Sequence, residues 1–360
     1  MIPKETVDLI FETARIEEVV GDFVPLKKRG VNFIGNCPFH NEKTPSFTVS
    51  PSKGIYKCFG CGKGGNSINF IMEIEHFSYP DALKFIAKKY NIEIQEEELT
   101  QKQVELANEK ESLFIITKFA NEYFKGILWN TDEGKAIGLS YFKERGFSDE
   151  IIKKFELGYN PKEKDAFSNI ATLKGYDKDI LVNSGLSLFN SKSRDLIDRF
   201  KERAIFPIQS YSGRTLGFGA RAFNINAKAK YLNSPETLIY YKSKVLYGLN
   251  HAKTAINKND LCYIVEGYTD VISMHQVGIE NVVSASGTAL SIEQIKLINR
   301  LTKNIVLLFD GDQAGLKATY KSINMILKED MNVKIASFPE GEDPDSFSKK
   351  LSKKEFQKFL

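Results

Sequence analysis

Three short apolar runs in the last third of the chain have the length and composition of buried strands. Residues 261–265 and 305–309 are rich in β-branched and aromatic side chains, and residues 333–338 form the third run. Helical patterns of apolar residues lie between these runs, over residues 269–276, 292–301 and 314–327. Because strands and helices alternate, we predict a parallel sheet with helices on both faces.

Apolar residues also recur at helical spacing in the first third of the chain. The spacing predicts helices over residues 2–20, 68–90 and 113–128. The acidic stretch 93–111, with seven Glu, two Lys and no aromatic residue, predicts a linker or an exposed helix. A turn at Ser212-Gly213 between two strand-like runs predicts a hairpin.

Each predicted strand of the C-terminal sheet ends in carboxylates. Glu266 follows the first run, Asp310 and Asp312 follow the second, and Asp343 and Asp345 follow the third. In parallel sheets, ligands collect outside the carboxyl ends of the strands. Loops of this kind are often acidic only because they are solvated, but three clusters at equivalent strand ends favour a site. We therefore predict that these carboxylates hold Mg²⁺, a hard cation that also suits phosphates.

Four residues in the N-terminal region have the spacing of a zinc site. Cys37 and His40 are separated by two residues, and Cys58 and Cys61 repeat that spacing after seventeen intervening residues. Two such pairs match a tetrahedral site with three thiolates and one imidazole. Because protein side chains fill all four positions, we predict a structural Zn²⁺.

Aromatic and basic residues alternate around the two ligand pairs. Residues 27–63 contain seven Lys or Arg and one Glu. Aromatic rings can stack on unpaired bases while lysines follow the backbone, so this module suits single strands, with Tyr56, Lys57 and Phe59 as the expected exposed contacts. The aromatic residues equally suit the interior of a small zinc ribbon.

Charge is segregated along the chain, although the net charge is only +4. Residues 192–258 carry thirteen positive and four negative side chains, whereas residues 260–345 carry seven and thirteen. A basic surface beside an acidic metal site is typical of an enzyme that polymerises nucleic acid, because one holds phosphates and the other their metals. A single basic residue is more often a solvated cation.

Bulk composition is that of a soluble protein with several domains. The chain has 360 residues, 42% hydrophobic and 27% charged, without a membrane-length apolar run or a signal peptide, so we expect a cytoplasmic protein. Three of the four cysteines lie in one cluster, which favours a metal site over disulfides. The sequence also lacks a P-loop, so we expect no helicase motor.

The acidic motifs resemble those of a known family. Glu266-Gly267-Tyr268-x-Asp270, Asp310-Gly311-Asp312-x-Ala314-Gly315 and Asp343-Pro344-Asp345 resemble the Toprim domain of bacterial DNA primases of the DnaG type. Residues 2–90 resemble the zinc-binding domain of that family. The resemblance implies an α+β multidomain fold with an N-terminal zinc ribbon, a mixed α/β basic subdomain and a Toprim α/β parallel sheet.

The same resemblance implies an activity and its residues. It implies a DNA-directed RNA polymerase that makes primers for replication on a single-stranded DNA template, with ribonucleoside triphosphates as substrates. Glu266, Asp310 and Asp312 are the implied catalytic residues, with Glu266 either a metal ligand or a general base. The basic residues that match positions lining the nucleotide and template groove are Arg199, Arg203, Arg221, Lys230 and Lys242. Arg145 is a further candidate phosphate or template contact.

We expect five segments along the chain. They are a zinc-binding domain (1–92), a linker (93–111), the basic N-terminal part of a polymerase core (112–258), a Toprim domain (259–345) and the start of a helical region (346–360). The chain stops inside an amphipathic helix, so we expect the helicase-binding domain of the family to lie outside it. The replicative helicase is therefore a partner by resemblance only, and we expect a monomer without membrane contacts.

Two other functions remain open at this point. A Toprim nuclease or topoisomerase-like hydrolase uses a similar acidic edge, although a topoisomerase needs a nucleophilic tyrosine in a separate domain. A noncatalytic zinc-ribbon protein that binds single strands would explain residues 27–63 but not the carboxylates. Ribonucleotide incorporation distinguishes all three.

Overall fold

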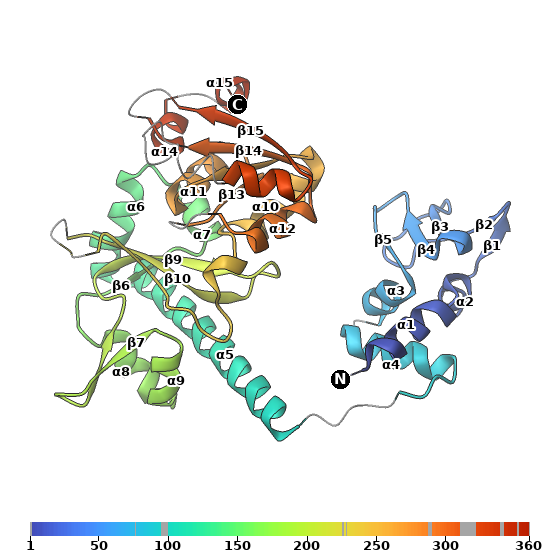
Figure 1. Ribbon diagram of the computed structural model, residues 1–360, viewed down its shortest axis with the longest axis horizontal. Helices are drawn as coiled ribbons and strands as arrows, with labels where there is room; N and C mark the ends of the chain where they lie inside the picture. Colours follow the sequence, from blue (N-terminus) through green and yellow to red (C-terminus); the bar gives the residue numbers. More distant parts are fainter. Residues whose placement is uncertain are drawn as a thin grey trace. The chain divides into compact units, whose positions relative to one another are not determined.

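The chain divides into two compact units, residues 1–105 and 106–360, in the computed structural model (Figure 1). The structure describes residues 2–75, 77–94, 100–224, 227, 229–286, 290–309, 322–338, 342–350 and 353–359. Asp310 and Asp312 lie outside these residues. Within the described part, no helix is both long and apolar enough to cross a membrane.

The N-terminal unit packs four helices against a five-stranded antiparallel sheet of order β1-β2-β3-β4-β5. Its elements are α1 (Lys4–Thr13), α2 (Ile16–Gly21), β1 (Lys27–Arg29), β2 (Asn32–Gly35), β3 (Phe47–Ser50), η1 (Pro51–Lys53), β4 (Ile55–Cys58), β5 (Gly64–Gly65), α3 (Ser67–Ile74) and α4 (Tyr79–Lys89). The two helices predicted here are each split in two. The second split has a local cause, because Ser78 caps α4 and Pro80 lies in its first turn.

The core of this unit is small and aromatic. The rings of Phe47 and Tyr56 stack with centroids 5.2 Å apart, and Phe70 meets Tyr56 edge-on at 5.4 Å. All three side chains are at most 2% exposed. Tyr56 therefore belongs to the interior of the ribbon, and our expectation of an exposed Tyr56 is wrong.

The C-terminal unit begins within a long helix, α5 (Gln101–Asn130). Residues 101–112 are exposed, and the buried face starts at Leu113. The predicted helix over 113–128 is thus the packed part of a longer one. The elements that follow are η2 (Gly134–Leu139), α6 (Ser140–Glu144), α7 (Asp149–Lys154), α8 (Ala166–Leu173), α9 (Lys178–Asn183), β7 (Ser187–Asn190) and β8 (Asp195–Asp198).

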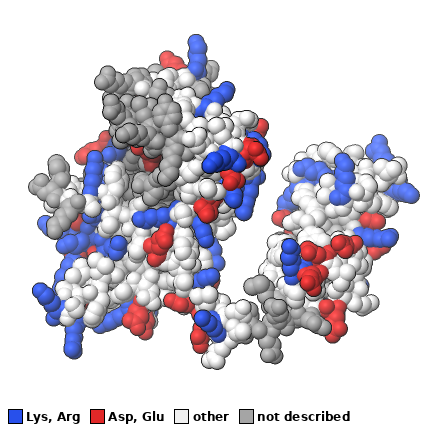
Figure 2. Space-filling model, in the orientation of Figure 1, with Lys and Arg blue, Asp and Glu red and all other residues white. Residues whose placement is uncertain are grey.

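An antiparallel sheet of order β11-β10-β9-β6 lies at the centre of this unit. Its strands are β6 (Gly158–Asn160), β9 (Arg203–Gln209), β10 (Thr215–Ala222) and β11 (Tyr231–Asn233). The predicted hairpin is confirmed, because β9 pairs with β10 across a turn in which Gly213 has a φ of 89°. In Figure 2, Lys and Arg side chains gather along the edge of the unit that carries β6, β7 and α8 in Figure 1.

The predicted parallel sheet is confirmed, with strand order β13-β12-β14-β15. Its strands and the elements around them are η3 (Lys242–Lys244), α10 (Leu249–Asn259), β12 (Cys262–Val265), α11 (Tyr268–Gln276), β13 (Val282–Ser284), α12 (Ile292–Asn299), β14 (Asn304–Phe309), β15 (Asn332–Ser337), α14 (Pro344–Ser348) and α15 (Lys353–Phe359), with residues 322–328 also helical. The chain leaves β12 for β13 on one side and returns to β14 on the other. Glu266 follows β12, at the point where the strand order reverses.

Alternate residues of β14 enter two different cores. Val306 and Leu308 join the core shared with α11 and the antiparallel sheet, whereas Ile305 and Leu307 join the core covered by α10 and α12. Helices therefore cover both faces of the parallel sheet, as predicted. The first of these cores joins the two sheets of the C-terminal unit and positions the residues between them.

Candidate functional site

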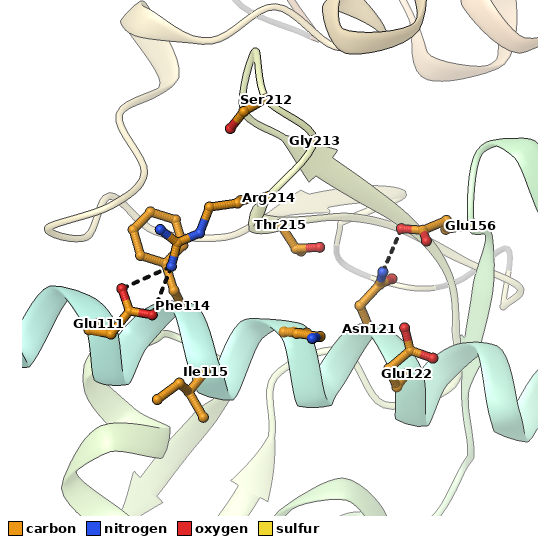
Figure 3. A pocket seen from close by; sticks show the side chains of 11 residues that line it. Glu111, Phe114, Ile115, Asn121, Glu122, Glu156, Ser212, Gly213, Arg214 and Thr215 are labelled. Atoms are coloured by element: carbon orange, nitrogen blue, oxygen red, sulfur yellow. Dashed lines mark hydrogen bonds and ion pairs between the residues drawn. The ribbon is translucent and has the colours of Figure 1, made fainter. Parts of the chain in front are cut away.

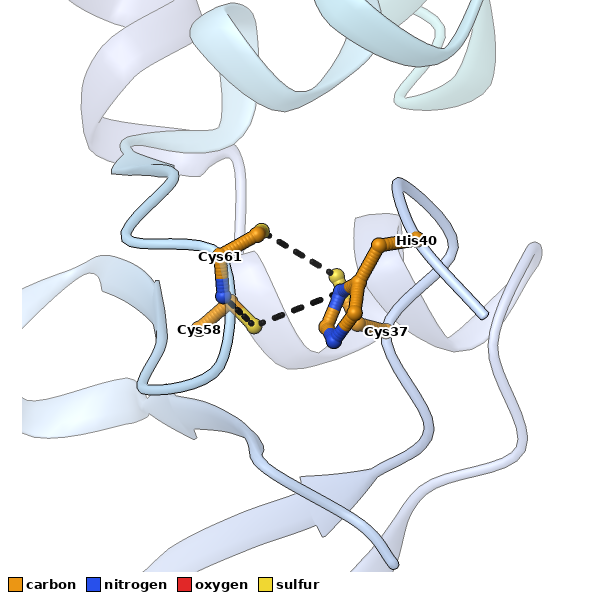
Figure 4. A group of neighbouring side chains, drawn as sticks. All are labelled: Cys37, His40, Cys58 and Cys61. Atoms are coloured by element: carbon orange, nitrogen blue, oxygen red, sulfur yellow. Dashed lines mark hydrogen bonds between the residues drawn. The ribbon is translucent and has the colours of Figure 1, made fainter. Parts of the chain in front are cut away.

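Two turns of the zinc ribbon bring four metal-ligand side chains together (Figure 4). Cys37 and His40 follow β2, Cys58 ends β4, and Cys61 lies in the next turn. Their ligand atoms all lie within 4.8 Å of one another. The distance from Cys37 Sγ to Cys61 Sγ is 3.8 Å. Zn–S bonds of about 2.3 Å at tetrahedral angles require a similar S–S separation of about 3.8 Å.

The chemistry of the cluster also fits zinc. Burial raises the pKa of Cys37 to about 12. Burial acts in the same direction on Cys58, but the Ser46 hydroxyl and the Cys61 amide lower its pKa to about 6. Three thiols this close ionise together only beside a cation, and Zn²⁺ supplies that charge. With four protein ligands the site is closed, which is typical of structural zinc.

The two other expected single-strand contacts differ in their environment. Phe59 is 76% exposed beside the second ligand pair. Lys57 is exposed, but its Nζ donates to the carbonyl of Gly62 at 2.6 Å. Phe59 is therefore the apolar ring that the ribbon presents to solvent next to its metal ligands.

A cavity of about 700 Å³ lies outside the carboxyl end of β12. It is lined by side chains from β11 and the loop after it, from the start of α11 and from the cap of α14. The predicted site residues among those lining it are Arg199, Lys230, Lys242, Glu266 and Asp343. Residues from two predicted segments, separated by up to 144 positions from Arg199 to Asp343, thus share one cavity.

The carboxylates of this cavity are held by the elements that carry them. Asp343 accepts a hydrogen bond from the Ser346 amide at 2.6 Å and thereby caps α14. Asp270, in the first turn of α11, accepts one from the Gly267 amide at 2.8 Å. Asp270 belongs to the motif of the predicted first strand but was not assigned a role. Its place in the lining identifies it as an additional candidate.

Asp345 is buried and lies apart from this lining, in a cluster of ion pairs. One oxygen accepts from Arg145 Nη1 at 3.1 Å. The other lies 2.9 Å from Lys349 Nζ and also accepts from the Ser273 hydroxyl. Both oxygens are thus engaged by groups of this chain, whereas Asp343 faces the cavity. Arg145, a candidate phosphate or template contact, is here the partner of Asp345.

Three arginines near the cavity have buried nitrogens that lack acceptors among the described residues. These atoms are Nε of Arg199, Nη1 of Arg203 and Nε of Arg221. Burial lowers the pKa of the Arg199 and Arg203 guanidinium groups. A buried guanidinium with an unused N–H is costly unless an anion completes it. These arginines therefore favour a phosphate-bearing ligand.

An alternating stack of rings and guanidinium groups extends from the cavity. Arg221 lies over the ring of Tyr141 at 5.0 Å and over that of Tyr231 at 5.9 Å. Tyr231 lines the cavity and is 42% exposed. Sequence reasoning did not assign Tyr231, because an isolated tyrosine after a lysine carries no pattern. Its exposed ring offers a surface for stacking.

A second cavity of about 480 Å³ separates α5 from the turn between β9 and β10 (Figure 3). Arg214 Nη2 lies 3.0 Å and 2.9 Å from the two carboxylate oxygens of Glu111, and its guanidinium stacks on Phe114 at 3.5 Å. At the other end, Glu156 accepts from Asn121 at 2.8 Å. The Arg214 contacts attach the hairpin to α5.

Three family models match the chain in succession. They are described as CHC2 zinc finger (residues 2–102), DNA primase catalytic core, N-terminal domain (residues 123–253) and Toprim-like (residues 263–348). Curated relatives include the DNA primase of Halalkalibacterium halodurans, which is 40% identical over 99% of this chain. The DNA primase of Staphylococcus epidermidis is 38% identical over the full length of this chain. The chain spans 59% and 60% of these two relatives.

Solved structures give the same match. The zinc-binding and RNA polymerase domains of the Aquifex aeolicus primase align with a TM-score of 0.64 and 33% identity, covering 98% of this chain and 84% of that one. A DnaG primase catalytic domain bound to ssDNA aligns with a TM-score of 0.64 and 32% identity, covering 70% of this chain and 81% of that one.

Proposed function

The chain belongs to the bacterial DNA primase family of the DnaG type, and from this premise we propose that it synthesises short RNA primers on single-stranded DNA. Ribonucleoside triphosphates are the proposed substrates. The relatives named DNA primase are longer than this chain, which spans 59% and 60% of two of them. The activity of this chain is therefore proposed separately from theirs.

One observation carries this proposal. Arg199, Lys230 and Lys242 face the same cavity as Glu266 and Asp343. A triphosphate needs cations for its oxygens and metal-binding carboxylates beside its reacting phosphate. This cavity combines both sets of side chains, and its volume of about 700 Å³ suits a nucleotide.

We propose Glu266, Asp343 and the undescribed Asp310 and Asp312 as the residues that would hold Mg²⁺ in this Toprim domain. When bound, Mg²⁺ supplies charge neutralisation and alignment of the reacting oxygens. Asp345 remains a predicted ligand, and its contacts with Arg145 and Lys349 favour a role in holding α14 in place instead.

We propose single-stranded DNA as the template, supported by the ssDNA-bound relative and by the basic arginines of this chain. Arg203 and Arg221, which do not line the cavity, are the proposed backbone contacts beyond the nucleotide. We also propose residues 93–111 as the linker, because residues 101–112 are exposed and the two units divide after residue 105.

The test is Mg²⁺-dependent incorporation of labelled ribonucleotides on single-stranded DNA. We expect Glu266→Gln to lower synthesis by about 100-fold or more while single-strand binding stays unchanged, because the substitution removes one negative charge from the cavity. Glu280→Gln is the matched control, since Glu280 pairs with Lys154 outside the cavity. Partial rescue by higher Mg²⁺ concentrations indicates a metal ligand, and loss of the acidic limb of the pH profile indicates a general base.

Two results would contradict the proposal. Full synthesis by Glu266→Gln would show that this cavity does not take part in primer synthesis. DNA cleavage without RNA product would indicate the hydrolase alternative.

A further inference from the structure

Glu42 lies between the two ligand pairs of the zinc ribbon without being a ligand itself. Its side chain is only 9% exposed. One carboxylate oxygen, Oε1, accepts from the backbone amide of Cys37 at 2.7 Å and from that of Ser46 at 3.0 Å. The other, Oε2, lies 3.2 Å from Nε2 of His40. Glu42 thus contacts both members of the first ligand pair.

Ser46 extends these contacts to the second ligand pair. Its hydroxyl donates to Glu42 Oε2, and the hydroxyl oxygen lies 3.3 Å from Cys58 Sγ. The carbonyl of Ser46 accepts from the Phe59 amide at 3.0 Å. Glu42 and Ser46 therefore join the turn after β2 to the turn after β4, independently of the metal.

The contact with His40 determines which ring nitrogen can bind metal. A carboxylate is only an acceptor, so Glu42 Oε2 at 3.2 Å favours the tautomer with hydrogen on Nε2. The unprotonated nitrogen is then Nδ1, which lies 3.8 Å from Cys58 Sγ on the metal side of the ring. The orientation of the imidazole and its tautomer both present Nδ1 to the metal site.

We propose that Glu42 is a positioning residue of the zinc centre. It holds His40 in the tautomer that presents Nδ1 to Zn²⁺, and it braces the first ligand pair through the Cys37 amide. The proposal rests on the zinc assignment. It goes beyond the proposed polymerase activity, on which it does not depend.

Packing around the ring makes Glu42 difficult to replace. A Cβ atom on Gly60 would lie 2.7 Å from His40 Nε2 and 2.9 Å from Ser46 Oγ. The second turn thus closes over the imidazole and limits the space for a water molecule at Nε2. Without the carboxylate, Nε2 loses the negative charge 3.2 Å away, and loss of such a partner typically weakens metal binding by about 10- to 100-fold.

The experiment compares zinc affinity in the full chain and in Glu42→Gln by competition with a chelator. Glutamine keeps an oxygen for the Cys37 and Ser46 amides but places its NH₂ group where Oε2 faces His40 Nε2 and the Ser46 hydroxyl, so it alters those two contacts and keeps the two amide bonds. We expect zinc binding to weaken by about 10- to 100-fold. The matched control is Glu73→Gln, because Glu73 pairs with Lys63 in the same unit and contacts no ligand. We expect parental affinity in that control.

A spectroscopic measurement separates positioning from general stability. The chain has only four histidines, so histidine-selective ¹⁵N labelling yields four imidazole rings to assign. We expect His40 in the zinc-bound parent to show metal at Nδ1 and hydrogen at Nε2, and we expect a mixture of tautomers in Glu42→Gln.

Two outcomes overturn the proposal. One is a Glu42→Gln chain that holds zinc as tightly as the parent. The other is a parent spectrum with metal at Nε2. Metal analysis of the parent tests the zinc assignment separately, because a chain that binds no zinc fails there before Glu42 is altered.

Discussion

His275 illustrates, at the scale of one residue, how burial sets a charge state. Its side chain is 4% exposed and lies against the ring of Phe155, with Nδ1 3.3 Å from Lys154 Nζ. Burial, with Lys154 nearby, lowers the pKa of His275 from 6.5 to about 3. Burial likewise lowers the pKa of the neighbouring His251 to about 4. Both rings are neutral in the folded protein at pH 7.

We expect the C-terminal unit to lose stability as the pH falls from 6.5 toward 4. In that interval the histidines bind protons in the unfolded chain but remain unprotonated in the folded protein. Acid therefore favours unfolding. His275→Gln should flatten this dependence by on the order of 2 kcal/mol between neutral pH and pH 4.5. Urea unfolding at a series of pH values measures it. An unaltered pH dependence in the variant would contradict the assignment.

At the scale of elements, side-chain periodicity predicted helices more reliably than their breaks. Apolar spacing continues through Ala14 and Arg15, yet α1 and α2 are separate helices there. The Arg15 amide, whose bond would have continued the helix, donates instead to the hydroxyl of Tyr90 at 3.1 Å. That partner directly follows α4 and lies outside any local window of sequence. The break after residue 74 is easier to predict from the sequence, because Ser78 and Pro80 mark the start of the next helix locally.

Gly219 determines how closely strand β10 approaches helix α11. A Cβ atom at this position would lie 2.4 Å from the ring of Tyr268, which stacks on Phe206 and donates to Asn233. We expect Gly219→Ala to destabilise the C-terminal unit by about 1–3 kcal/mol, because the buried ring must move. Denaturant unfolding measures this loss.

Gly126→Ala is the matched control for that substitution. Gly126 lies in α5, and its nearest neighbour to an added Cβ is 4.0 Å away. Alanine should slightly stabilise this helix. Equal stability of Gly219→Ala and the parent would show that Tyr268 has room to shift.

At the scale of the whole molecule, we expect the N-terminal unit to depend on zinc for its folding and the C-terminal unit not to. Its core is confined to a few helices and short strands around the zinc ligands, and structural zinc typically supplies about 10–16 kcal/mol to such folds. We expect Cys61→Ala to release zinc and unfold the N-terminal unit while the C-terminal transition stays in place. Metal analysis and calorimetry measure both effects.

Cys262→Ala is the control for zinc release. Cys262 is fully buried in β12, in the core of the parallel sheet and outside the zinc cluster. Its substitution should retain zinc and lower only the C-terminal transition. Zinc retention by Cys61→Ala would contradict a closed four-ligand site.

Local patterns in the sequence sufficed for the cluster of zinc ligands, the hairpin and the parallel sheet. Each depends on spacing within a short segment or on a topological rule that holds for any alternation of strands and helices. The metal roles of Glu266 and Asp343 stay predictions, and Asp310 and Asp312 lie outside the described residues.

Tertiary structure alone decided which side chains meet. Arg145 and Asp345 pair across 200 residues, Tyr56 turns inward, and Arg199 reaches the cavity of Glu266. A sequence pattern records which face of an element is apolar, but the neighbour that a polar side chain finds depends on how elements from distant segments pack. That packing is set by the shared core between the two sheets, and no window of sequence contains it.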